Sequence, residues 1–202
     1  MRRFSVVLVV LAFAVAGPVH AYRLLYKEQL YPLIQYQLNM YPRDWAENIQ
    51  WLDLALKADF ANPLYALAKI DNTDEWEFYR DLFMMHLNLK LVEQYLEWGS
   101  EFNKQVAYFY NYPWKQENLD SLNKAEALFK YALNFWTEAK SWSDKAAAAR
   151  FRWMNLDGVH FWQDESYRIQ NGELDYNFIV NRHLTSLEGV RKTFEAMNRS
   201  TY

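Results

Sequence analysis

The segment DEWEFYRDLFMMHLNLKLVEQYLEW, residues 74–98, decides the fold of this chain. One set of its apolar residues recurs at alternating spacings of four and three, the period of a helix face: Phe78, Leu82, Met85, Leu89, Val92 and Leu96. A second apolar set lies broadly on the opposite side: Trp76, Tyr79, Phe83, Leu87, Leu91, Tyr95 and Trp98. Because a helix with two apolar faces needs neighbours on both, the segment predicts the central helix of a layered all-α domain.

Helical spacing continues on both sides of this segment, and no period-two strand pattern interrupts it. We expect five to seven helices, with candidate segments at about 23–40, 44–58, 63–70, 74–98, 118–141, 143–169 and 175–197. Gly99 marks a stop or a bend, after which residues 100–108 can resume the helix. The 118–141 segment alternates large and small residues on one face, which predicts close approach of another helix: Leu122, Ala125, Phe129, Ala132, Trp136 and Ala139.

The first 21 residues have the pattern of a secretory signal peptide. Arg2-Arg3 gives a positive start, residues 4–16 are uncharged and apolar, Gly17-Pro18 breaks the run, and Ala21 offers a small residue for cleavage. As a helix the apolar run spans about 20 Å, less than the roughly 30 Å of a bilayer core. We therefore expect cleavage rather than retention as an anchor, with 22–202 as a single exported domain, periplasmic or secreted.

Composition narrows the class of protein further. Aromatic residues make up 18% of the chain and cysteine is absent, so packing rather than disulfides must hold the exported fold together. Without Arg2 and Arg3, about 20 basic residues face 25 acidic ones, a balance that does not favour nucleic acid as a partner. No later stretch has 18 uninterrupted apolar residues, so we expect no membrane span after signal cleavage.

Two resemblances point to a helical scaffold. Ala125-x3-Phe129-x2-Ala132 resembles the second helix of a tetratricopeptide repeat. Residues 62–141, with MMHLNLKLVEQYLEWGS at 84–100 and AYFYNYPWKQENLDSL at 107–122, are similar to exported helical proteins of spirochaetes, some associated with the periplasmic flagellar motor. The resemblance implies either a tetratricopeptide-like array of helical hairpins or a multi-helix bundle. It carries no catalytic motif, so no functional residue follows from it.

Asp157, His160 and Asp164 form a candidate metal site. On a continuous helix their spacing would put two carboxylates and an imidazole on one face, a ligand set that suits a divalent transition metal. Gly158 inside the motif can break that face, and Arg168 one turn beyond Asp164 offers an ordinary surface ion pair. Both a metal-dependent enzyme and a structural role therefore remain open.

The aromatic stretch from Tyr108 to Trp114 is the candidate binding site. Tyr108, Tyr110, Tyr112 and Trp114 could stack on a glycan, an apolar small molecule or partner side chains, while their polar tips hydrogen-bond. The alternative is a loop that folds back and closes one end of the helical layers.

The sequence contains no His-Glu-x-x-His, Gly-x-Ser-x-Gly or phosphate-binding glycine loop. We therefore expect a non-enzymatic scaffold that binds an envelope or periplasmic protein and needs no cofactor. A ligand-binding module that uses the aromatic stretch is the alternative.

Overall fold

The computed structural model describes residues 24–201, except for the side chains at 109, 110 and 201; the predicted signal peptide lies outside this range. Within it the fold is all-α, as predicted, with four short 3-10 segments. The six α-helices are α2 (Lys27–Met40), α3 (Trp45–Lys57), α4 (Thr73–Phe102), α5 (Lys115–Ala146), α6 (His160–Gln170) and α7 (Tyr176–Ala196).

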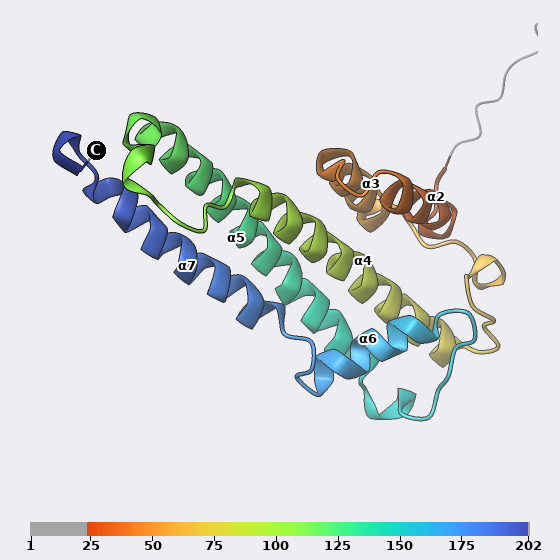
Figure 1. Ribbon diagram of the computed structural model, residues 1–202. Helices are drawn as coiled ribbons and strands as arrows, with labels where there is room; N and C mark the ends of the chain where they lie inside the picture. Colours follow the sequence, from red (N-terminus) through yellow and green to blue (C-terminus); the bar gives the residue numbers. More distant parts are fainter. Residues whose placement is uncertain (1–23, 202) are drawn as a thin grey trace, which may run out of the picture.

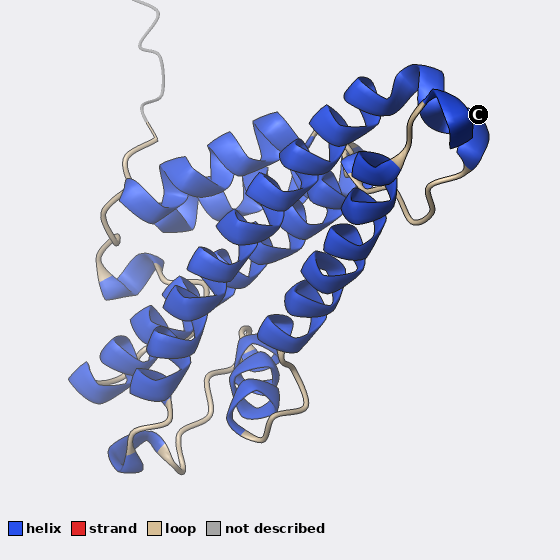
Figure 2. Ribbon diagram, turned by 90° about the vertical axis from the view of Figure 1, so that its left-hand side faces the viewer, coloured by secondary structure: helices blue, strands red, loops and turns tan. Residues whose placement is uncertain are grey.

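Three long helices, α4, α5 and α7, run alongside one another in Figure 1. The middle one is α5, which packs against both α4 and α7. The α2–α3 hairpin lies on the other side of α4, and α6 packs across α4 and α5 near the start of α4 (Figures 1 and 2). At the opposite end, the 3-10 segment Phe109–Trp114 contacts the C-terminal segment Arg199–Thr201.

The central helix is buried on both of the faces that its sequence predicts. Phe78, Leu82 and Met85 of the first apolar set are buried, and so are Tyr79 and Phe83 of the second. The first helical turn gains a cap, since the Asn72 side chain accepts a hydrogen bond from the backbone N–H of Glu75. Helix α4 therefore carries a neighbour on each side and organises the core.

Helix α4 does not stop at Gly99, which was one of the two predicted outcomes, but continues to Phe102. Gly99 is instead a point of close approach to α5. A Cβ atom at this position would lie 2.6 Å from Cε1 of Phe129, a distance that real Cβ atoms do not show. The alternating seam of α5 lies at the same contact, and its six predicted residues are all buried. The large-and-small pattern thus predicted the helix contact correctly.

Several predicted helix boundaries differ from the structure. Residues 63–70 form only the 3-10 turn Pro63–Tyr65, and residues 103–108 form a loop. Helix α5 passes through Ser143, whose buried hydroxyl hydrogen-bonds to that of Ser166, so the predicted helix does not begin at residue 143. The predicted helix 143–169 is interrupted before α6, where Gly158 takes a φ of 94° that L side chains rarely adopt.

The helices at 44–58 and 175–197 agree with the prediction to within one residue at each end. Of the two predicted architectures, the multi-helix bundle describes this arrangement better. A tetratricopeptide repeat fits two helices into about 34 residues, whereas α4 alone has 30. No helix in residues 24–201 is both long and apolar enough to cross a membrane.

Two glycines in helices give a direct test of the α4–α5 contact. We expect Gly99→Ala to destabilise the protein by roughly 1–2 kcal/mol, because overpacking against Phe129 outweighs the gain of about 1 kcal/mol in helix propensity. A Cβ atom added to Gly189 in α7 would meet no atom within 4 Å, so Gly189→Ala should stabilise by roughly 0.5–1 kcal/mol. Urea unfolding of both variants measures the difference; equal effects would contradict the close contact.

Candidate functional site

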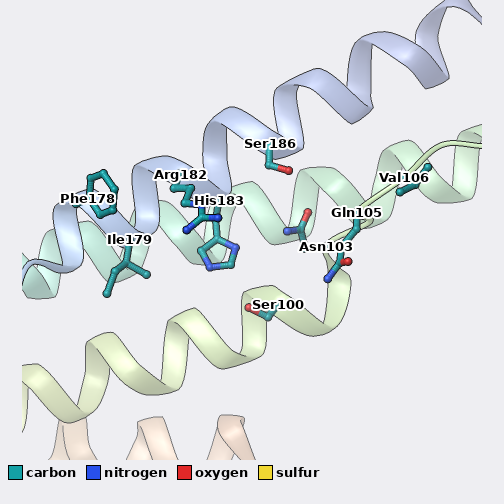
Figure 3. Close-up of a pocket in the computed structure, with 9 residues that line it drawn as sticks. All are labelled: Ser100, Asn103, Gln105, Val106, Phe178, Ile179, Arg182, His183 and Ser186. Atoms are coloured by element: carbon teal, nitrogen blue, oxygen red, sulfur yellow. The ribbon is translucent and has the colours of Figure 1, made fainter.

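A cleft opens between the end of α4, the loop that follows it and the first half of α7 (Figure 3). Its volume is about 600 Å³, within the range of roughly 300–1,000 Å³ that is common for ligand sites. We call it the α4–α7 cleft. The residues that line it are Ser100, Asn103, Gln105, Val106, Phe178, Ile179, Arg182, His183 and Ser186.

A helix cap and an ion pair hold the α7 wall of the cleft in place. Helix α7 begins at a cap in which the Asp175 carboxylate accepts hydrogen bonds from the backbone N–H groups of Asn177 and Phe178. Farther along, Arg191 of α7 forms an ion pair of 2.5 Å with Glu126 of α5. The opposite wall turns away at Asn103, where α4 ends and the extended loop begins. The walls thus belong to packed helices, and only the 103–108 segment is a loop.

His183 forms the inner surface of the cleft. Its ring points from α7 toward α4 in Figure 3 and packs against Phe129 of α5, with 5.2 Å between ring centroids. Burial and the neighbouring Arg182 guanidinium lower the pKa of His183 below its usual 6.5. The imidazole is therefore neutral at pH 7, so it offers a hydrogen-bond donor and an acceptor but no charge.

Arg182 is the charged group of the cleft, since none of the nine lining residues is acidic. Among residues 24–201, no carboxylate pairs with Arg182 and no hydrogen bond satisfies its guanidinium. Arg191, farther along the same helix, differs sharply because it contacts both Glu126 and Glu188. The cleft therefore presents an uncompensated positive charge.

Apolar side chains surround this charge at the mouth of the cleft. Phe178 is 67% exposed and Val106 is 51% exposed, although both are large enough to favour burial. Inside the cleft, the side-chain oxygen of Asn103 is shielded from solvent and has no hydrogen-bond partner in the described part of the chain. One cation, several amide and hydroxyl groups and an apolar rim are the usual components of a binding site.

The predicted aromatic site lies just beyond the cleft, at the start of α5. Tyr108 and Trp114 are 50% and 58% exposed, whereas Tyr112 packs partly against the core. The side chain of Tyr110 lies outside the described residues. Tyr112 thus packs inward while the two ends of the stretch remain on the surface, and the binding role of the stretch stays a prediction.

Asp157, His160 and Asp164 do not share the helical face that was expected of them. Asp157 lies in a turn before Gly158, while His160 begins α6 and Asp164 follows one turn later. Among residues 24–201, no three His, Cys, Asp or Glu side chains are grouped so that they could hold a metal ion. The positive φ of Gly158 is the physical reason, because it ends the helical path through the motif.

Sequence reasoning missed a buried polar cluster that joins three helices. Nδ1 of His86 in α4 lies 2.6 Å from a carboxylate oxygen of Glu165 in α6, and Nε2 lies 3.0 Å from the hydroxyl of Tyr31 in α2. Trp162 stacks on the imidazole. Both ring nitrogens of His86 are thus occupied, which makes the cluster a cross-link between helices. The partners lie 55 and 79 residues away, so no local spacing could reveal them.

Asp81 of α4 has a buried carboxyl group, and the pKa of this group gives a pH-dependent prediction. Burial raises its pKa from 3.8 to about 6, against the attraction of Lys145. The folded state therefore favours the protonated carboxyl group. The free energy of unfolding is highest below pH 3.8, where the carboxyl is protonated in both states, and it falls as the pH rises through 6. Asp81→Asn should therefore stabilise the protein by roughly 1–2 kcal/mol at pH 7.5 and by little at pH 4.

Thermal unfolding at the two pH values tests this prediction, with the exposed Asp164→Asn as the matched control. A gain for Asp81→Asn that is the same at pH 4 and pH 7.5, or a loss at pH 7.5, would contradict it.

Comparison with known proteins identifies a family but no function. Residues 74–197 match the model of a family described as a domain of unknown function, DUF8513. The match spans α4 to α7 and includes every residue that lines the α4–α7 cleft, whereas α2 and α3 precede it. Neither the curated proteins nor the solved structures gave a match.

Proposed function

This chain belongs to the DUF8513 family, and we propose that it is an exported, non-enzymatic module that binds a partner protein of the cell envelope through the α4–α7 cleft. The observation that carries the proposal is the unpaired Arg182 inside a concave site whose rim exposes Phe178 and Val106. Protein interfaces favour this combination, because aromatic and arginine side chains contribute most of their binding energy.

The position of the cleft within the family match supports the same proposal. Its lining residues come from α4, α7 and the loop after α4, all within the residues that the family model covers, so the site belongs to the shared part of the chain. The loop that forms one wall leads directly to the half-exposed Tyr108, which extends the apolar surface beyond the cleft. The proposed interaction surface therefore includes both the cleft and the loop that leads to Tyr108.

The envelope as the place of action rests on the sequence. Residues 1–21 have the pattern of a signal peptide. The resemblance of residues 62–141 to exported helical proteins of spirochaetes favours a role in envelope assembly, including that of the periplasmic flagellar motor. A packed helical domain without cysteine suits such a role, since its stability does not depend on the redox state of the compartment.

Affinity capture from the envelope fraction of the native host tests the proposal. The cleft variant combines Phe178→Ala with Arg182→Gln, and the control variant combines Trp153→Ala with Arg43→Gln. The control removes an exposed aromatic ring and an arginine charge away from the cleft. We expect the unmodified protein and the control to capture the same partner, and the cleft variant to lose at least nine-tenths of it.

Both variants change exposed side chains, so circular dichroism should show equal helix content and thermal stability. Equal capture by the cleft variant would overturn the proposed surface. Absence of any protein above background would overturn the proposed function.

A further inference from the structure

We infer that the α4–α7 cleft recognises a carboxylate group carried by a peptide segment of its partner, with Arg182 as the group that binds it. This inference rests on the proposed function and adds the chemistry of the ligand. The reasons are the charge of the cleft, the number of its charges and the nature of its rim.

The charge of the cleft favours an anion as its ligand. Arg182 has no carboxylate partner within the described range, and His183 beside it is neutral at pH 7. Lys104 and Glu101 flank the lining residues in sequence and have opposite charges, so together they do not change the net charge around the cleft. A guanidinium binds a carboxylate through two parallel hydrogen bonds, a geometry that a single free arginine can provide.

The number of charges favours a carboxylate over a phosphate group. A phosphate ester carries a charge of roughly −1.5 to −2 at pH 7, and proteins bind it with clusters of arginines. The cleft offers Arg182 alone among its lining residues, and this one charge matches one carboxylate. The net negative charge of the exported domain likewise does not favour the phosphates of a nucleic acid.

The rim favours a peptide as the carrier of that carboxylate. Phe178, Ile179 and Val106 give apolar contact on both sides of the opening, where partner side chains can pack. Gln105 and Ser186 line the same cleft and can hydrogen-bond to peptide amides. A carboxylate can come from an Asp or Glu side chain or from the end of a chain, and the two sources can be separated experimentally.

An array of random hexapeptides tests the inference. Each peptide is made with a free carboxyl terminus and as the amide, and each acidic peptide has a twin with Asn or Gln in place of Asp or Glu. The full exported chain is applied unmodified, as Arg182→Gln, and as the matched control Arg43→Gln. Fluorescence anisotropy then measures the affinity of the strongest ligand for each protein.

We expect peptides with a carboxylate to dominate the bound set of the unmodified protein and of Arg43→Gln. Arg182→Gln should weaken the strongest ligand on the order of tenfold or more, since a hydrogen bond to a charged group is lost. If the Asn or Gln twin of an acidic peptide no longer binds, the recognised carboxylate belongs to a side chain. If the amide form of a peptide no longer binds, the recognised carboxylate is the chain terminus.

Equal binding of acidic and neutral twins, or an unchanged preference in Arg182→Gln, would overturn the carboxylate inference. So would the absence of peptide binding. Loss of partner capture in the Phe178→Ala/Arg182→Gln double variant would still stand in those cases, so failure of the ligand chemistry is distinguishable from failure of the proposed function.

Discussion

The close packing of α4 on α5 is the constraint on which the rest of the structure depends. At Gly99 the two helices approach so closely that the ring of Phe129 occupies the space of a Cβ atom. Helix α4 carries the α2–α3 hairpin on its other side, and α5 carries α7. Because the chain has no cysteine, no disulfide can replace this contact if it fails. The whole arrangement therefore relies on a seam of alternating large and small side chains.

The cleft follows from this packing. Helix α4 ends at Phe102, and the chain crosses the 103–108 loop and the 3-10 segment Phe109–Trp114 before α5 begins at Lys115, so the end of α4 faces α7 across an open space. His183 fills the inner part of that space against Phe129, the same ring that fixes the α4–α5 contact. The cleft is thus built directly on the core. This explains how a site with a loop on one side can present Arg182 from a firmly packed helix.

Local patterns in the sequence predicted the fold class, the two buried faces of α4 and the seam of α5, because helical periodicity is a property of neighbouring residues. The boundary errors arose where tertiary contacts outweigh local signals: Gly99 lies inside α4, where its missing side chain leaves room for Phe129 of α5, and Ser143 lies inside α5 and bonds to Ser166. The cleft could not be predicted, since its two walls are separated by about 70 positions in the sequence. Only the pairing of α4 and α7 on α5 brings them together.

Site-specific photo-crosslinking tests whether the α4–α7 cleft is the surface that binds a partner. Benzoylphenylalanine in place of Phe178 puts the reactive group on the rim, and the same residue in place of the exposed Trp153 gives a control away from the cleft. In native cells, we expect a discrete higher-mass adduct from position 178 that Arg182→Gln strongly reduces, and none from position 153. No adduct from position 178, or the same adduct from both positions, would contradict it.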